Sequence, residues 1–209
     1  NPVGFSYKWQ RYASGSWSDI SGATSASYAL GDADVGKQLR VIASYTDLHG
    51  TVETATSNAT SAIVNVNDLP VGFTVSVSGT ATEDQTLLGS VGAVTDADGV
   101  GTLNYRWQRY NTGTSVWDDI SGATSINYTL GDADVGKQIR LKVYYTDGNG
   151  TVETAYSSAS TPIANVNDAP VGVPTLSGTQ TEGQTLTANM SGVSDADGLG
   201  TFSYQWQRS

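Results

Sequence analysis

The chain has 209 residues, with 20 acidic side chains against 10 basic ones, which gives a formal net charge of −10 at pH 7. Proteins that bind nucleic acid neutralise phosphates with lysine and arginine, so we expect no nucleic-acid partner. No apolar run is long enough to insert into a membrane. The absence of cysteine excludes disulfide bonds and thiolate metal sites.

Most of the chain repeats with a period of about 100 residues. The stretch GDADVGKQ occupies Gly31–Gln38 and returns at Gly131–Gln138. Other words recur at a similar spacing: YxWQR from Tyr7, Tyr105 and Tyr204, DISGATS from Asp19 and Asp119, GTVETA from Gly50 and Gly150, and NVNDxPVG from Asn65 and Asn165. The repeat therefore defines the basic unit of organisation.

The words NDLP and NDAP mark the boundaries between units, because proline disfavours a continuing central strand. We predict that residues 1–66 are the C-terminal part of one repeat, with about its last five strands. Residues 67–166 form a complete repeat, and residues 167–209 hold the first three strands of a third.

Within a unit, apolar and polar residues alternate, which is the period of a β-strand. In the stretch 139–145, Ile139, Leu141, Val143 and Tyr145 alternate with polar or exposed positions, and residues 39–45 repeat the pattern. Turn signals such as Asp98-Gly99 fall between these runs, and no window has the pattern of an amphipathic helix. A unit of this length with short strands is predicted to be an antiparallel sandwich of two sheets.

The residues around Trp107 and the stretch INYTLGDADVGKQIRLKV that follows resemble strand C and the E–F region of bacterial immunoglobulin-like repeats. Such repeats occur in tandem, alongside cadherin-like repeats, in large secreted surface adhesins. The resemblance covers the whole chain, although the cysteine pair of antibody domains is absent. It implies an all-β chain of tandem immunoglobulin-like antiparallel β-sandwich repeats of about 100 residues, located on the bacterial cell surface or secreted, with a role in cell adhesion or biofilm formation.

The acidic pair of GDADVGKQ is open to three interpretations: a calcium loop, a catalytic pair of carboxylates, or a corner that the fold needs. In immunoglobulin-like folds this position is the E–F corner, so we favour the structural role. Asp134 is expected to accept hydrogen bonds there, and Gly136 to relieve the backbone. Nothing indicates a catalytic cleft recurring in each copy, and the chain is not expected to be an enzyme.

A second group of acids is expected to meet at the pole of each domain that faces the preceding unit. The linker word NVND, which is similar to the cadherin calcium linker, enters the same pole as the word DADG and the loop after residue 146. Oxygen ligands that converge from three segments suit calcium, although a solvated turn remains the alternative. The predicted ligands are Asn67, Asp68, Asp96, Asp98 and Asp147, with Asn167, Asp168, Asp195 and Asp197 at the next boundary. Glu83 and Glu182 are weaker candidates that approach from the other side of the boundary.

The aromatic residues are expected to pack within the fold rather than to bind a ligand. Trp9, Trp107 and Trp206 fall in the third strand of their units and are predicted to pack in the core. Trp17 and Trp117 are expected to pack at a sheet edge, with an aromatic platform for polysaccharide as the alternative.

The sequence therefore predicts a non-enzymatic stalk of stacked repeats, stiffened by calcium, in an extracellular adhesin or surface fibre. The partners would be neighbouring repeats or further copies of the chain, together with a cell-surface glycan. Two alternatives remain: a filament whose chains join head to tail by strand or domain completion, and a polysaccharide-binding module.

Overall fold

The computed structural model describes residues 4–208, and within them the chain is all-β, with 39% of it in strands and no α-helix. The strands are β1 (Ser6–Ala13), β2 (Ser16–Asp19), β3 (Gln38–Thr46), β4 (Val52–Thr56), β5 (Val75–Ser78), β6 (Thr86–Val91), β7 (Asn104–Asn111), β8 (Val116–Asp119), β9 (Asn127–Thr129), β10 (Ile139–Thr146), β11 (Val152–Tyr156), β12 (Thr175–Ser177) and β13 (Thr187–Asn189). Two short 3-10 helices, η1 (Asp32–Asp34) and η2 (Asp132–Asp134), carry the acidic corner. The described part contains no helix with the length and hydropathy of a membrane span.

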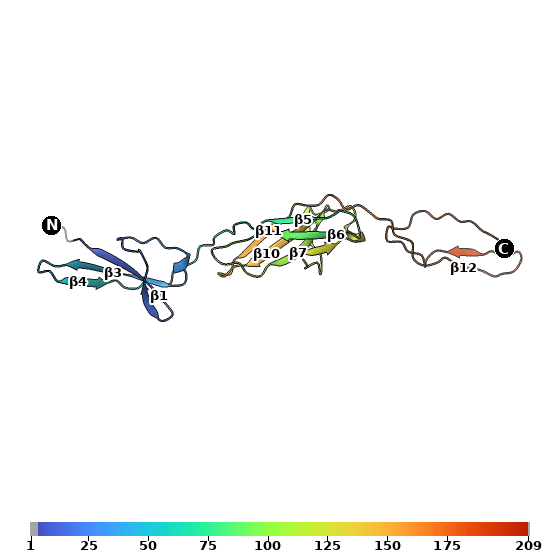
Figure 1. Cartoon of the computed structure of the whole chain (residues 1–209). Coiled ribbons are helices and arrows are strands. Elements are labelled where there is room, and N and C mark those ends of the chain that lie inside the picture. Colours follow the sequence, from blue (N-terminus) through green and yellow to red (C-terminus); the bar gives the residue numbers. More distant parts are fainter. Residues whose placement is uncertain (1–3, 209) are drawn as a thin grey trace. The chain divides into compact units, whose positions relative to one another are not determined.

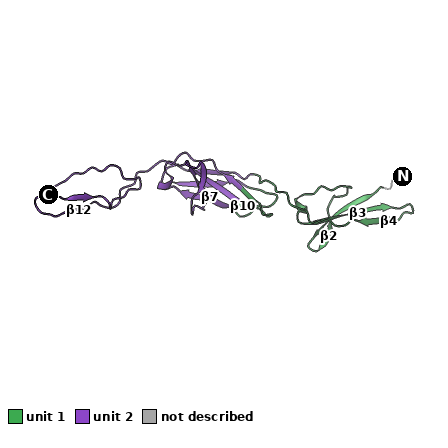
Figure 2. Cartoon of the chain, turned by 180° about the vertical axis from the view of Figure 1, so that it is seen from behind, with its two compact units in different colours: residues 1–71, 94–102, 145–153 green, residues 72–93, 103–144, 154–209 purple. Residues whose placement is uncertain are grey.

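The chain divides into two compact units, which are coloured separately in Figure 2. Unit 1 comprises residues 1–71, 94–102 and 145–153, and unit 2 comprises residues 72–93, 103–144 and 154–209. This division follows spatial compactness rather than the sequence repeat. The domain boundaries predicted from the repeat words therefore stay predictions.

Unit 1 contains an antiparallel sheet in the order β2-β1-β3-β4 (Figure 1). Trp9 of β1 lies opposite Val41 of β3, and Leu39 at the start of that strand is 1% exposed. The indole N–H of Trp9 donates to the Ser25 carbonyl at 3.0 Å, and its ring centroid lies 5.7 Å from that of Tyr28. These contacts hold the segment after β2 against one face of the sheet.

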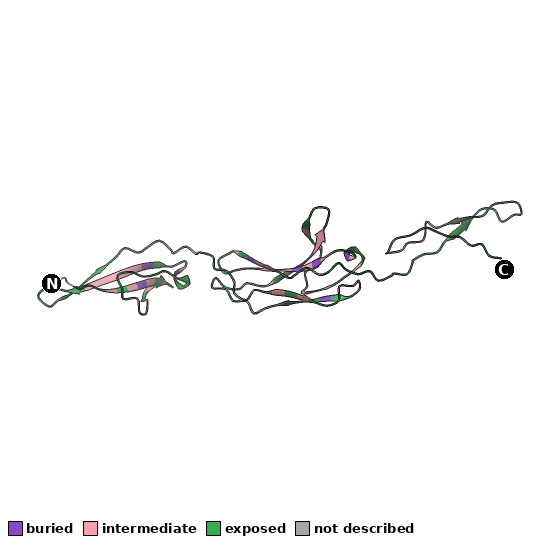
Figure 3. Cartoon of the chain, turned by 90° about the horizontal axis from the view of Figure 1, so that it is seen from above, coloured by how far each residue is buried: buried purple, intermediate pink, exposed green. Residues whose placement is uncertain are grey.

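Two antiparallel sheets contribute to unit 2, in the orders β11-β10-β7-β8 and β5-β6-β9. The core between them joins residues from both sheets and from the connecting segments: Leu87, Trp107, Leu130, Ile139, Leu141, Val143 and Ile163. Buried residues are drawn purple in Figure 3. The predicted alternation in β10 is confirmed, because Ile139, Leu141, Val143 and Tyr145 are each at most 1% exposed. The antiparallel all-β architecture expected from the period-2 pattern is thus present.

Trp107 is a core residue, as predicted, with no exposed surface. Its N–H donates to the Ser125 carbonyl at 3.0 Å, and its ring stacks on Tyr128 with centroids 5.6 Å apart. The first copy makes the same two contacts at Trp9, so the contacts belong to the repeat rather than to one copy.

The corner GDADVGKQ adopts one structure in both copies, and Asp134 is its centre. This side chain is 1% exposed, and its Oδ2 accepts the N–H of Gly131 at 3.0 Å and the O–H of Tyr128 at 2.9 Å. Its Oδ1 accepts the Nε–H of Arg109 at 2.8 Å. Burial and the hydrogen bond to Asp134 raise the pKa of Tyr128 to about 12. The fold role predicted for Asp134 is therefore confirmed.

The turn after η2 needs a residue that tolerates a left-handed backbone. Gly136 has φ of +73°, and Gly36 in the first copy has φ of +71°. Residues other than Gly, Asn and Asp rarely adopt this left-handed backbone conformation. In the first copy Asp34 accepts hydrogen bonds from Arg11, Tyr28 and Gly31, as Asp134 does from their counterparts. One of the two acids in DAD is thus committed to the fold, and the other, Asp132, is free for another role.

Gly89 of β6 leaves no room for a side chain, which yields a prediction. A Cβ atom at this position would overlap the Ile126 carbonyl oxygen and crowd the Leu141 side chain. We expect Gly89→Ala to lower the free energy of unfolding by about 2 kcal/mol, measured by chemical denaturation, because overpacking displaces neighbours. Gly131→Ala is the control. It meets no atom within 4 Å in an extended backbone and should change stability by less than about 0.5 kcal/mol.

Residues 169–208 contain a two-stranded antiparallel pair, β12 and β13, and no buried position. The prediction that Trp206 packs in a third strand is wrong for this structure, since residues 198–208 form no strand and Trp206 is 57% exposed. The equivalent strand β7 is held by β8 and β10. Among the described residues no strand pairs with residues 198–208, so this stretch lacks the hydrogen bonds that hold β7.

Candidate metal centre

Three carboxylates from distant parts of the sequence meet in unit 2, and we call them the Glu83 triad: Glu83, Asp132 and Asp168. One oxygen from each side chain lies within 4.8 Å of the others. Glu83 is 1% exposed, Asp168 is half-buried and Asp132 is exposed. Within residues 4–208 no other three acidic or histidine side chains lie this close together.

The backbone around Glu83 explains why these three side chains converge. The N–H of Glu83 donates to the Ala164 carbonyl at 2.9 Å, and the N–H of Asp84 donates to the Leu130 carbonyl at 3.1 Å. Asp84 has φ of +64°, a conformation that Asp tolerates better than most residues, and it makes the tight turn possible. The turn is thus pinned to the two segments that carry Asp132 and Asp168.

The triad is short of positive charge. Oε2 of Glu83 accepts the Val166 N–H at 3.1 Å, whereas its Oε1 is buried and accepts no hydrogen bond. The Val166 bond lowers the pKa of Glu83, but the neighbouring Asp132 carboxyl and burial outweigh it, so the pKa lies above its ordinary value. Burial, followed by the charges of Asp132 and Asp197, also raises the pKa of Asp168. A cation, or a proton shared between Glu83 and Asp132, would relieve both the repulsion and the unpartnered oxygen.

A second acidic group, which we call the Asp98 cluster, lies in unit 1 and consists of Asp96, Asp98, Asp147 and Glu153. Asp98, Asp147 and Glu153 are 8%, 6% and 8% exposed, and Asp96 is half-buried. They come from the DADG loop, the loop after β10 and strand β11. Four carboxylates that are largely withdrawn from water need either donors or a cation.

Most oxygens of the Asp98 cluster have hydrogen-bond donors. Asp98 accepts the Asp68 N–H and the Asn149 side-chain amide, each at 2.8 Å, and the first of these lowers the pKa of Asp98. Asp96 accepts the Asp98 N–H at 2.9 Å and the Tyr145 O–H.

Asp147 is the exception in this cluster. Its Oδ1 accepts the N–H groups of Asn149 and Thr151, at 2.9 and 2.8 Å, but its buried Oδ2 accepts no hydrogen bond. The cluster thus has one carboxylate oxygen that its own side chains do not satisfy.

The structure brings together most of the acids predicted at the first boundary, but in a different set. Asp96, Asp98 and Asp147 are neighbours in the Asp98 cluster, and Asp68 joins them through its backbone N–H. The amide of Asn67 donates to Glu153 at 2.9 Å, so it binds a carboxylate of the cluster. The side chain of Asp68 is exposed, and the charge of Asp32, followed by burial, raises its pKa.

At the second boundary the predicted residues repeat these contacts. The Asp168 N–H donates to Asp197 Oδ2 at 2.8 Å, and the Asp197 N–H donates to Asp195 Oδ1 at 3.0 Å. Asn167 donates to the carbonyl of Asp168 at 2.8 Å and does not reach an acid. The side chain of Asp168 takes part in the Glu83 triad instead.

The predicted ligand set leaves out Asp132 and Glu153, and it counts Glu83 only among the weaker candidates. The sequence pattern places Asp132 with Asp134 at the corner, and in the structure only Asp134 turns inward. One signal could have pointed to Asp132. It recurs as Asp32 in the first copy, although the corner needs only one acid, Asp134 or its counterpart Asp34. Glu153 lies in the recurring word GTVETA, where alternation would place the apolar Val152 and Tyr156 toward the core instead, so its burial is known only from the structure.

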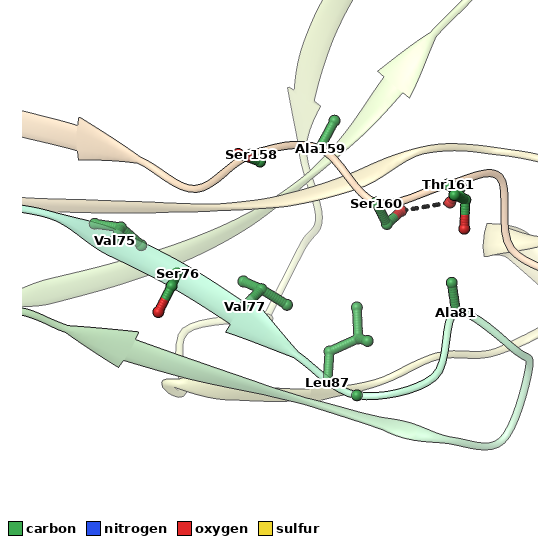
Figure 4. Close-up of a pocket in the computed structure, with 10 residues that line it drawn as sticks. Val75, Ser76, Val77, Ala81, Leu87, Ser158, Ala159, Ser160 and Thr161 are labelled. Atoms are coloured by element: carbon green, nitrogen blue, oxygen red, sulfur yellow. Dashed lines mark hydrogen bonds between the residues drawn. The ribbon is translucent and has the colours of Figure 1, made fainter.

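A cavity beside the core of unit 2 does not resemble a metal or catalytic site. It has a volume of about 330 Å³, lies between β5 and residues 158–161, and is lined by aliphatic and hydroxyl side chains such as Val75, Val77, Leu87 and Ser158 (Figure 4). The Ser160 hydroxyl there donates to the Thr161 carbonyl at 2.6 Å. The lining offers no carboxylate, so the two acidic groups remain the candidate site.

No protein-family model matches the chain, and no curated protein is significantly similar to it. Function is therefore argued from the repeats, the fold and the two acidic groups.

Proposed function

We propose that the chain is part of the repeat region of a bacterial extracellular adhesin or surface fibre, built from tandem immunoglobulin-like units. Its role is structural rather than enzymatic: the units give reach and spacing, and calcium stiffens the connection between them. The location and the adhesive role rest on the resemblance of the repeat words. Calcium rests on the site itself.

One observation carries the calcium proposal: Glu83 is almost fully buried beside two further carboxylates, and one of its oxygens has no donor. All the donors of the triad are hard oxygens, which suit calcium, whereas histidine and thiolate ligands that favour zinc or copper are absent from it. Asp168 belongs to the linker word, while Glu83 and Asp132 belong to the preceding repeat. A cation held by all three would tie the linker to that repeat.

Calcium should raise the melting temperature of the 209-residue chain by about 10 °C relative to the same protein in chelator. A ligand at 100 times its dissociation constant stabilises by about 2.7 kcal/mol, and each kcal/mol is worth about 4–8 °C in a small domain. The measurement is thermal unfolding followed by circular dichroism, with magnesium as the matched control. Magnesium should give a smaller shift, because it demands a tighter octahedral site.

Light scattering under the same conditions separates the proposal from the filament alternative. A calcium-dependent shift at constant molecular mass supports a stiffened stalk. Oligomers that form with or without calcium would favour chains that complete one another. An unchanged melting temperature at 10 mM calcium, about ten to a hundred times the dissociation constant of extracellular calcium modules, would remove calcium from the proposal.

A further inference from the structure

One face of the sheet β11-β10-β7-β8 carries an unusual group of cations and rings. In β10 the residues Ile139, Leu141 and Val143 are buried in the core, so the alternate residues Arg140, Lys142 and Tyr144 project from the opposite face. The register places Arg106 opposite Lys142, and Gln108 opposite Arg140. The face is therefore basic on a chain whose net charge is −10.

Arg140 is held between two aromatic rings. Its guanidinium carbon lies 4.4 Å from the ring centroid of Trp117 and 4.2 Å from that of Tyr156. Its Nε–H donates to Gln108 at 2.8 Å, and Gln108 donates in turn to Asp119 at 2.7 Å. This arrangement fixes the position of the cation and covers one face of Trp117, in keeping with the packing role expected for this residue rather than with the alternative of an aromatic platform.

The cations of this face have no carboxylate partner. The ion pairs among residues 4–208 join Lys8 to Asp19, Arg11 to Asp34 and Arg109 to Asp134. Arg106, Arg140 and Lys142 thus lie without an acidic side chain within 4.0 Å. Asp119 lies on the same face, where it accepts the Gln108 amide, so the cations there face one nearby acid. The Debye length of about 8 Å at physiological ionic strength screens the acids elsewhere on the chain.

Comparison of the two copies separates what the fold needs from what it does not. The first copy keeps the stacked arginine: Arg40 lies 4.3 Å from the Trp17 ring and donates to Gln10 at 2.8 Å. The positions equivalent to Lys142, Tyr144 and Tyr156 hold Ile42, Ser44 and Thr56 instead. The same strand pairing forms with these residues, as Ile42 lies opposite Thr56. Lys142 and the two tyrosines are therefore an addition to the repeat.

We propose that this face, formed by Arg106, Lys142, Tyr144 and Tyr156, binds an acidic polysaccharide. Carboxylates on successive sugars pair with Arg106 and Lys142, and the sugar rings lie against the tyrosines, of which Tyr156 is 46% exposed. A flat sheet face with aromatic rings suits a chain of sugars better than an acidic peptide, which would add to a sheet edge or fill a groove. Arg140 already covers one face of the Tyr156 ring and Lys142 lies over the Tyr144 ring, so a sugar would contact the rest of each ring. The inference is independent of the calcium site and adds a ligand to the proposed stalk.

The test measures binding of the 209-residue chain to sodium polygalacturonate, in chelator so that calcium cannot bridge protein and polymer. Neutral dextran and polyglutamate are the comparison polymers. We expect polygalacturonate to bind, to weaken as sodium chloride rises from 50 to about 200 mM, and to bind more tightly than either comparison polymer.

The matched variant is the triple substitution Lys142→Ile, Tyr144→Ser and Tyr156→Thr, which installs the residues that the first copy already accommodates. It should keep the circular dichroism of the parent and weaken polygalacturonate binding at least about tenfold, or about 1.4 kcal/mol. The reverse triple, Ile42→Lys, Ser44→Tyr and Thr56→Tyr, should add a second binding site. No binding by the parent, equal binding by the first triple, or equal binding of polyglutamate would overturn the proposal.

Discussion

Replacing Asp134 with alanine should lower the free energy of unfolding of the repeat around Trp107 by about 3 kcal/mol. The side chain is 1% exposed and accepts hydrogen bonds from Gly131, Tyr128 and Arg109. Its removal leaves a partly buried guanidinium without its counter-ion, and breaking such a pair costs more than forming it gains. Hydrogen exchange of the β10 amides in the full chain would measure the loss where it occurs.

Asp132→Ala is the matched control, two residues away in the same word. Asp132 is exposed and lies beside Glu83 and Asp168, so in chelator its removal should leave stability unchanged or slightly higher. With calcium present, the calcium-dependent gain in the free energy of unfolding should be much smaller for Asp132→Ala than for the parent. If Asp132→Ala were as destabilising as Asp134→Ala in chelator, the assignment of Asp134 to the corner and of Asp132 to the Glu83 triad would be wrong.

The sequence could predict the strands and the core because their signals are local. The alternation at 139–145 places Ile139, Leu141 and Val143 on one side of a strand whatever the partner strands are. Trp107 and Asp134 were predicted correctly for a related reason. Each recurs in the other copy with its neighbours, which indicates a need shared by every unit of the fold.

The Glu83 triad could not be predicted in the same way, because it depends on contacts between distant segments. Glu83 is 49 residues from Asp132 and 85 from Asp168. It reaches them only because a left-handed Asp84 and two backbone hydrogen bonds pin its turn between residues 130 and 164. The turn itself recurs at Glu182-Gly183, where Gly183 has φ of +79°, but nothing in the spacing of the sequence shows which distant acids meet Glu83.

Trp206 shows that a local strand pattern can be present where no strand forms. Its word YQWQRS repeats the strand of Trp107, so its local pattern predicts a buried strand residue. A strand, however, exists only when neighbours supply its hydrogen bonds, and β7 obtains them from β8 and β10. Local pattern therefore predicts the capacity to form a strand, and the presence of partners decides whether it forms.

Glu83→Gln should change stability in opposite directions with and without calcium. In chelator the ionised Glu83 faces Asp132 and Asp168 in a buried position, and its raised pKa means that the folded state disfavours the charge. The neutral amide keeps the shape of the side chain and removes the repulsion, so the melting temperature should rise. This advantage should vanish as the pH falls below the ordinary value of 4.5, where the parent carboxyl is protonated in both states.

With calcium present, the same substitution removes one charged ligand from the triad. Calorimetric titration should show calcium binding at least about tenfold weaker than in the parent, and the calcium-dependent rise in melting temperature should shrink accordingly. Glu182→Gln, the counterpart in the third repeat, is the control, because Glu182 is exposed and should be silent in both conditions. A lower melting temperature for Glu83→Gln in chelator would mean that Glu83 stabilises the fold by itself. The unpartnered oxygen would then no longer be an argument for a cation, and the connection between repeats would have to be stiff without one.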